Sequence, residues 1–163
     1  MKCEIRAKML KQRLSYSKDE VFNISKEISN KIKRLDVYKK AKIIGIYMPI
    51  KNEIILDLDK TKCFPKLEGP KMEFFIPTSF VKGMYGIPEP VGQLVKKNDI
   101  DIIFVPLLAV DRKMNRIGYG KGYYDAYLNG FKGLKIGVGY NFQMVDEIDA
   151  EDQDIPLDMF ITN

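Results

Sequence analysis

The chain of 163 residues contains no histidine. Histidine is the most common general base of enzymes and a very common ligand of transition metals. Its absence excludes Ser-His-Asp hydrolysis and histidine-ligated zinc chemistry. Any catalysis must therefore depend on lysine, arginine, aspartate, glutamate, tyrosine, the backbone or a bound ion.

Cysteine and long apolar runs are also scarce. The two cysteines, Cys3 and Cys63, are too few for a disulfide framework in a chain of this length, and neither has the partner spacing of a metal site. No run approaches the roughly 18 apolar residues that span a bilayer, and the charged start MKCEIRAKMLKQRL is unlike a signal segment. These absences predict a soluble protein of the reducing cytoplasm.

The composition predicts one compact domain over residues 1–163, because 45% of the residues are hydrophobic and a chain of this length can bury a core. The formal net charge of +5 is dispersed along the chain. Dispersed lysines usually only keep a surface solvated, so the charge alone says little about partners. No repeat, low-complexity tract or linker interrupts the sequence, and we expect a monomer.

Hydrophobic periodicity predicts two amphipathic helices at the start of the chain. Apolar residues recur at near-helical spacing from Ile5 to Leu14, and SKDE at Ser17–Glu20 has the form of a capping box ahead of a second periodic segment. A short helical stretch is expected near Ile54–Lys60. Another is expected over Tyr124–Leu128, ended by Asn129-Gly130.

Short apolar runs predict strands at Lys42–Met48, Met72–Pro77, Asp101–Val110, Lys135–Tyr140 and Phe160–Thr162. The segment Gly83–Gly92 carries three glycines and two prolines and is expected to be loop or edge. The alternation predicts an α/β fold with a mostly parallel central sheet and helices on both faces, a Rossmann-like three-layer architecture. Ligands of such sheets bind at the carboxyl ends of the strands.

The decapeptide RIGYGKGYYD at Arg116–Asp125 combines three alternate glycines with two cations and a carboxylate. Glycines let backbone N–H groups turn toward one anion, while Arg116 and Lys121 supply positive charge. Asp125 would approach a triphosphate through Mg²⁺. The pattern is neither a Walker A loop nor a Rossmann fingerprint, and the residues alone leave open a glycine-rich connector packed on its tyrosines.

The stretch DRKMNRIGYGKGYYDAYL at Asp111–Leu128 resembles the signature of the 5-formyltetrahydrofolate cyclo-ligases, also called methenyltetrahydrofolate synthetases. The family's core pattern is Arg-x-Gly-x-Gly-Lys-Gly-Tyr-Tyr-Asp. The resemblance covers nearly the whole chain, from an early Lys-x-x-x-Arg element through a strand followed by a glutamate, an Ile-Pro-x-Pro element and an apolar Val-Pro strand to a late aspartate.

The resemblance implies an ATP- and Mg²⁺-dependent ligase of one-carbon metabolism. Such an enzyme converts 5-formyltetrahydrofolate to 5,10-methenyltetrahydrofolate and releases ADP and phosphate. ATP phosphorylates the formyl oxygen, and N10 of the folate then closes the ring. Because the folate is the nucleophile in both steps, a chain without histidine is compatible with this chemistry.

An ATP site is implied at the first helix and the glycine loop. Lys2 and Arg6 leave one helix face a turn apart, although two such cations would by themselves usually only be solvated. Lys121 and Arg116 are expected to be catalytic, and Lys8, Lys11 and Arg13 are expected at the surface. The resemblance assigns ATP contacts to Lys2, Cys3, Glu4, Ile5, Arg6, Arg116, Ile117, Gly118, Tyr119, Gly120, Lys121, Gly122, Tyr123 and Tyr124.

The folate site is implied beside it. The carboxylate of Glu53, expected at the carboxyl end of a strand, would accept from the N–H groups of a pterin, and Met48 would contact the flat ring. Tyr85 would stack on the folate, with a packed loop tyrosine as the alternative. The resemblance assigns folate contacts to Met48, Glu53, Tyr85, Tyr119, Gly120, Lys121, Gly122 and Tyr123.

Magnesium is implied at Asp125 and Asp154. An acidic loop such as Glu151–Asp158 is usually only solvated, so this role also depends on the resemblance. Many relatives have histidine where this chain has Gln153, and some have arginine where it has Tyr119.

Two other classes of function remain open. Another ATP-dependent phosphotransferase or ligase with the same glycine loop would bind Mg-ATP but fail with folate. A nucleic-acid-binding module is suggested by the basic charge and by tyrosines beside Lys121, but no RNP, KH or zinc-finger pattern occurs. We expect a reduced folate and ATP as partners, without nucleic acid or membrane.

Overall fold

The computed structural model describes all residues from Met1 to Asn163. Its helices are α1 (Lys2–Leu14), α2 (Lys18–Lys33), α3 (Asp36–Lys40) and α4 (Tyr123–Leu128). Short 3₁₀ turns occur at Met84–Gly86, Lys97–Asp99 and Asn141–Gln143. The strands are β1 (Ile43–Gly45), β2 (Thr61–Glu68), β3 (Lys71–Lys82), β4 (Pro88–Val95), β5 (Ile102–Val105), β6 (Ala109–Val110), β7 (Arg116–Ile117), β8 (Leu134–Val138) and β9 (Met159–Ile161).

Seven of these strands form one sheet in the order β4-β3-β2-β1-β5-β8-β9. The pairs from β2 to β9 are parallel, while β3 and β4 extend the sheet as an antiparallel hairpin. All four residues of the central strand β5 are buried, as expected for a parallel strand covered on both faces. The predicted mostly parallel α/β sheet is therefore confirmed.

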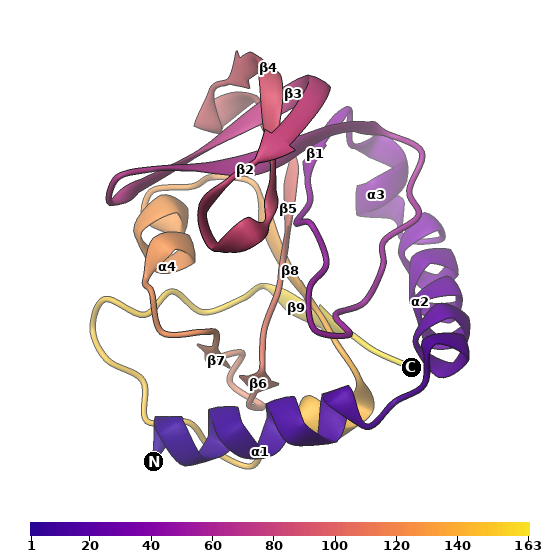
Figure 1. Ribbon diagram of the computed structural model, residues 1–163, viewed down its shortest axis with the longest axis vertical. Coiled ribbons are helices and arrows are strands. Elements are labelled where there is room, and N and C mark those ends of the chain that lie inside the picture. Colours follow the sequence, from indigo (N-terminus) through magenta and orange to yellow (C-terminus); the bar gives the residue numbers. More distant parts are fainter.

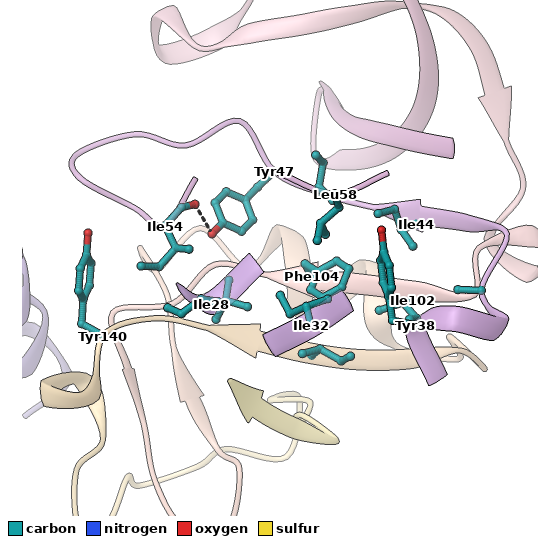
Figure 2. Close-up of a cluster of buried hydrophobic side chains, with 14 residues drawn as sticks. Ile28, Ile32, Tyr38, Ile44, Tyr47, Ile54, Leu58, Ile102, Phe104 and Tyr140 are labelled. Carbon is teal, nitrogen blue, oxygen red and sulfur yellow. Dashed lines mark hydrogen bonds between the residues drawn. The ribbon is translucent and has the colours of Figure 1, made fainter. Parts of the chain in front are cut away.

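Helices cover both faces of this sheet (Figure 1). On one face α2 and α3 contribute Ile28, Ile32 and Tyr38 to a cluster with Ile44 and Phe104 of the strands (Figure 2). On the other face α4 packs Tyr127 and Leu128 into a second apolar cluster with residues of β2, β3 and β5. The predicted three-layer arrangement is confirmed.

The two helices predicted at the start of the chain are present as α1 and α2, and α2 begins at the predicted capping box. Ser17 caps α2, since its side chain accepts from the Glu20 N–H while the Glu20 carboxylate accepts from the Ser17 N–H. Helix α1 lies below β6 and β7, beyond the carboxyl ends of the parallel strands (Figure 1). No helix of the protein combines the length and apolar character needed to cross a membrane.

The predicted helix near Ile54–Lys60 is wrong, because this segment forms neither a helix nor a strand. Ile54 and Leu58 are buried, and their four-residue spacing imitates a helix. The backbone N–H groups of Ile55 and Asp57 instead donate to the hydroxyls of Ser25 and Ser29 in α2. Those serines supply the hydrogen bonds that a helix would have supplied internally. Figure 2 also shows the Tyr47 hydroxyl donating to the Ile54 carbonyl.

Several strands also differ from the sequence-based prediction; for example, the strand expected over Asp101–Val110 is split into β5 and β6, and β6 pairs with β7 in a separate small sheet. The strand β2 was not predicted, because TKCFPKLE mixes lysines and a proline with few apolar residues. The strand expected over Lys42–Met48 is shorter, since β1 ends at Gly45 and the chain continues as buried but irregular backbone. The segment Gly83–Gly92, expected as loop or edge, contains a 3₁₀ turn and the first part of the edge strand β4.

Candidate active site

A cavity of about 440 Å³ lies at the carboxyl ends of β1 and β5. Its walls come from α1, the segment after β1, the β3–β4 hairpin, the glycine loop and the acidic loop before β9. This volume is within the usual range for small-molecule sites. The sequence-predicted residues that line it are Lys2, Arg6, Met48, Glu53, Tyr85, Arg116, Ile117, Gly118, Tyr119, Gly120, Lys121, Gly122, Tyr123, Tyr124, Asp125 and Asp154.

Three residues expected to bind ATP do not line the cavity. Cys3 and Glu4 are exposed, and Ile5 packs against the small apolar cluster around Met9 and Leu108. Lys2 and Arg6 line the cavity because residues four apart share a helix face, whereas the three residues between them point elsewhere.

Glycines in the loop Arg116–Asp125 make room for two arginines. A Cβ added to Gly118 would lie 2.6 Å from Nη1 of Arg116, and one added to Gly120 would lie 3.2 Å from Cζ of Arg6. Gly120 also has a φ of 91°. The Nε of Arg6 donates to the Gly118 carbonyl at 2.8 Å, which ties α1 to the loop. The absence of side chains thus brings both guanidinium groups to one wall.

Arg116 is a largely buried cation with unused hydrogen-bonding capacity. Its side chain is 7% exposed, and its Nη1 donates to the Pro106 carbonyl at 3.0 Å. Its Nη2 lies 3.9 Å from Oδ1 of Asp125, and its Nε has no partner. Burial lowers the pKa of Arg116 and the charge of Asp125 opposes that change. An anion in the cavity would satisfy this guanidinium.

The carboxylates of Asp125 and Asp154 are tied to the same acidic loop. Asp125 accepts from the Ile155 N–H at 3.1 Å, and Asp154 accepts from the Glu151 N–H and the Lys2 ammonium, both at 2.9 Å. Partial burial raises the pKa of Asp154, but these two hydrogen bonds and the positive charges of Lys2 and Arg116 together outweigh it, and the pKa lies below its ordinary value.

This pair of carboxylates is too small to bind a metal ion with protein ligands alone, but it suits a magnesium ion that is also bound by other oxygens. No group of three or more histidine, cysteine, aspartate or glutamate side chains is arranged to bind a metal. Mg²⁺ commonly uses one or two carboxylates and completes its shell with water and phosphate oxygens. The Lys2 ammonium on Asp154 shows that a cation is already favourable there. Asp125 and Asp154 are the residues that would hold the ion.

Lys121 faces the hairpin β3–β4 across the cavity. Its Nζ lies 5.5 Å from the ring centroid of Tyr85, within the range of a cation–π contact. Tyr85 is 64% exposed and has a φ of 58° in the turn Met84–Gly86. A left-handed conformation is unusual for a tyrosine. Both side chains line the cavity and remain accessible from outside it.

Glu53 is buried rather than solvated, and only 5% of it is exposed. It follows a tight turn after β1, and its Oε1 accepts from the Ile50 N–H at 2.9 Å. Its Oε2 has no partner. Burial raises the pKa of Glu53 to about 7, although the Ile50 hydrogen bond and the positive charge of Arg13 oppose the increase. An unpaired buried acceptor at the cavity wall suits a ligand N–H donor.

Several residues of the site were not predicted. Much of the apolar wall comes from segments without a motif, including Tyr47, Ile50, Leu67, Met72, Met84, Ile87 and Pro106. Arg13 was expected at the surface, and this prediction is wrong because it is 1% exposed. Its position, seven residues or two helical turns after Arg6, was the available signal.

A comparison with known protein families agrees with this geometry. The model of the 5-formyltetrahydrofolate cyclo-ligase family matches residues 1–163. The chain belongs to this family. Its members are ligases, so the cavity is the candidate active site of an enzyme.

Individual members of the family are similar over nearly their whole length. A 5-formyltetrahydrofolate cyclo-ligase of Mycoplasma genitalium is 33% identical, with 99% of this chain and 98% of that protein covered. The solved structure of 5,10-methenyltetrahydrofolate synthetase from Aquifex aeolicus has 37% identity and a TM-score of 0.87, and covers 99% of this chain and 89% of that one. The corresponding structure from Mycoplasma pneumoniae has 28% identity and a TM-score of 0.83, with 98% and 97% covered.

Proposed function

We propose that the protein converts 5-formyltetrahydrofolate to 5,10-methenyltetrahydrofolate with Mg-ATP and releases ADP and phosphate. One observation carries this proposal. A single cavity joins a wall of four cations and two carboxylates to an apolar wall that contains the unpaired Oε2 of Glu53. The first wall suits a triphosphate and the second suits a flat heterocycle with N–H donors.

In the proposed complex the phosphates bind between α1 and the glycine loop. Arg116 and Lys121 stabilise the charge of the phosphoryl group in transfer, and Lys2 and Arg6 bind the remaining phosphate oxygens. Asp125 and Asp154 would hold a magnesium ion, whose positive charge would stabilise the negative charge that develops in phosphoryl transfer. The nucleotide can approach the backbone closely at Gly122, where no atom lies within 4 Å of an added Cβ, while the space beside Gly118 and Gly120 holds the guanidinium groups of Arg116 and Arg6.

The pterin binds against the apolar wall. Glu53 accepts from its N–H groups, and Met48 and Tyr85 contact the faces of the ring. Tyr123 and Tyr124 close the side of the pocket that adjoins the nucleotide, because both line the cavity. The formyl group then lies between the folate wall and the phosphate wall.

The proposed reaction consists of two nucleophilic displacements, one at phosphorus and one at the formyl carbon. The formyl oxygen attacks the terminal phosphorus of ATP, and the bond from that phosphorus to ADP breaks. N10 then attacks the activated formyl carbon and releases its proton, and the carbon–oxygen bond breaks as phosphate leaves. Both nucleophiles belong to the folate, so the protein contributes positioning and electrostatic stabilisation rather than a covalent nucleophile.

The assay combines purified protein, Mg-ATP and 5-formyltetrahydrofolate, and follows the absorbance of the methenyl product together with ADP release. We expect both products in equal amounts, and neither without ATP. ATP binding without methenyl product would refute the proposal and favour another phosphotransferase. RNA binding with a steep salt dependence and no ATP hydrolysis would favour a nucleic-acid module.

We also propose that residues 1–163 act as one domain, as a monomer and in the cytoplasm. Both cysteines are free thiols, and the buried Cys63 would not require an oxidising compartment. Light scattering of the purified protein at assay concentration tests the monomer, since a dimer would double the measured mass.

A further inference from the structure

Arg13 is a buried cation without a carboxylate partner. Its residue exposure is 1%, and no salt bridge of the protein involves it. Its three hydrogen bonds go to neutral acceptors: Nε donates to the Lys51 carbonyl at 2.9 Å, Nη1 to the Leu107 carbonyl at 3.1 Å and Nη2 to the Tyr119 hydroxyl at 2.5 Å. Burying a charge in this way is costly unless it is fully hydrogen-bonded.

The three acceptors belong to three different segments near the cavity. Lys51 lies in the turn after β1, Leu107 lies after β5, and Tyr119 lies in the glycine loop. Lys51 and Tyr119 line the cavity, whereas Arg13 does not. The Arg13 guanidinium therefore links the turn after β1 to the glycine loop, which form two walls of the cavity, without itself lining the cavity.

The turn that Arg13 contacts is strained. Lys51 and Asn52 have φ angles of 48° and 62°, which are uncommon for residues other than glycine. Asn52 Nδ2 donates to the carbonyls of Arg13 and Tyr16 at 3.1 and 3.0 Å, and the Tyr140 hydroxyl donates to the Asn52 carbonyl at 2.7 Å. Strained backbone persists where its surroundings over-determine it. Glu53 follows directly and takes its position from this turn.

The Arg13 guanidinium also orients the hydroxyl of Tyr119. It accepts from Arg13, so its own hydrogen is not used in that bond. No acceptor within the protein takes this hydrogen, and Tyr119 lines the cavity. Lys51 Nζ lies 5.4 Å from the Tyr119 ring centroid, which further links the turn to the glycine loop. Tyr119 is therefore prepared to donate to a ligand.

We propose that Arg13 is a positioning residue for the heterocycle half of the site. It fixes the Glu53 turn relative to the Tyr119 hydroxyl, so that one bound ring donates to Glu53 and accepts from Tyr119. This inference rests on the proposed function, and it narrows the ligand to a planar heterocycle that presents both N–H donors and a carbonyl or ring-nitrogen acceptor. Arg13 acts through Glu53 and Tyr119 and does not touch the substrate.

The test compares Arg13→Met, Arg13→Lys, Tyr119→Phe and the double variant Arg13→Met/Tyr119→Phe. Lys11→Met is the matched control, because it removes an exposed cation from the same helix. For each folded variant we measure kcat and the KM values for 5-formyltetrahydrofolate and for ATP, with the midpoint of thermal unfolding.

We expect Arg13→Met to raise the folate KM about tenfold or more, as loss of hydrogen bonds from a charged donor commonly does, and to leave the ATP KM within about twofold. Arg13→Lys should restore part of the loss. The double variant should differ little from Arg13→Met, because coupled residues are not additive. Lys11→Met should match the unchanged protein.

Three results would overturn the inference: an unchanged folate KM in Arg13→Met, equal increases in the KM values of folate and ATP, or Arg13→Met and Tyr119→Phe effects that multiply. If Arg13→Met does not fold, Tyr119→Phe with and without Arg13→Lys gives the same cycle. If the unchanged protein forms no methenyl product, the proposed function fails. Equilibrium dialysis with 5-formyltetrahydrofolate then tests Arg13 by the same comparison of affinities.

Discussion

The Nζ of Lys2 donates a 2.9 Å hydrogen bond to Oδ2 of Asp154, although the two residues lie 152 positions apart in the chain. The bond joins the first turn of α1 to the acidic loop before β9. In the proposed complex a magnesium ion would compete with the Lys2 ammonium for Asp154. Lys2 would then be released toward the phosphates, so metal and nucleotide binding should depend on each other.

Asp154→Asn should raise the Mg²⁺ concentration for half-maximal turnover by about tenfold or more, because a neutral amide replaces a charged ligand. A titration of methenyl formation with Mg²⁺ at saturating ATP measures this. Asp152→Asn is the control, since Asp152 is exposed and does not line the cavity. An unchanged Mg²⁺ requirement in Asp154→Asn would exclude Asp154 as a ligand.

Lys121→Ala should reduce turnover by about two orders of magnitude or more, as expected for loss of a charge that stabilises the transition state. Its side chain is exposed at the cavity wall, so the thermal midpoint should hardly change. Lys132→Ala removes an exposed lysine outside the cavity and should retain full turnover. Near-normal turnover of folded Lys121→Ala would show that this lysine is not catalytic.

Gly120→Ala should raise the ATP KM about tenfold, because the new methyl group would displace the Arg6 guanidinium from the cavity wall. Gly130→Ala is a matched control: both glycines have positive φ, but no atom lies within 4 Å of a Cβ added to Gly130. Both variants should lose about 1 kcal/mol of stability from backbone strain. If both also had the same ATP KM, the contact with Arg6 would have no role in nucleotide binding.

Glu53 should make the protein less stable as pH rises. The pKa of Glu53 is about 7 in the folded protein against a reference of 4.5, so between these values the folded state binds more protons than the unfolded state. The free energy of unfolding therefore falls from pH 4.5 to about pH 7, by at most roughly 3 kcal/mol, and the loss remains above that pH. Denaturant titrations of the unchanged protein and of Glu53→Gln test this.

Comparing the unchanged protein with Glu53→Gln separates the effect of Glu53 from that of other carboxyls. The lowered pKa values of Asp111 and Asp154 act in the opposite direction, because they make the protein less stable as the pH falls into the acidic range. Glu53→Gln should lack the decline and exceed the unchanged protein in stability at pH 8. If the two proteins have parallel pH profiles, folding does not raise the pKa of Glu53.

The sequence predicted the helices and strands that are determined by residues within the same segment. Apolar runs and capping residues predicted β5, β8, α2 and α4. The four-residue spacing put Lys2 and Arg6 on one helix face, and the family resemblance assigned that face to the site, where both residues line the cavity. The irregular backbone of Ile54–Lys60 could not be predicted, because two of its N–H groups donate to serines of α2, about 30 residues earlier. Tertiary partners decided that segment, and local periodicity did not contain them.

The candidate site shows the same limit. The glycine loop has a specific motif that the sequence reveals, whereas the apolar wall has none, because it is assembled from separate segments that include the β3–β4 hairpin. The buried state of Glu53 also escaped prediction, since a glutamate in a polar segment is usually solvated. The resemblance indicated that Glu53 matters, but only the packing around the Lys51–Asn52 turn explains its environment.

Helix α1 is attached to the rest of the protein largely through polar groups. Met9 is its only buried apolar residue, whereas Lys2, Arg6 and Arg13 bond to the acidic loop, the glycine loop and the backbone behind the cavity. Ligand binding in the cavity should therefore slow amide hydrogen exchange along the whole of α1, including residues that do not contact the ligand. High salt, which screens these charged contacts, should instead make amide exchange along α1 faster. The exchange rate of this helix therefore reports whether the cavity is occupied.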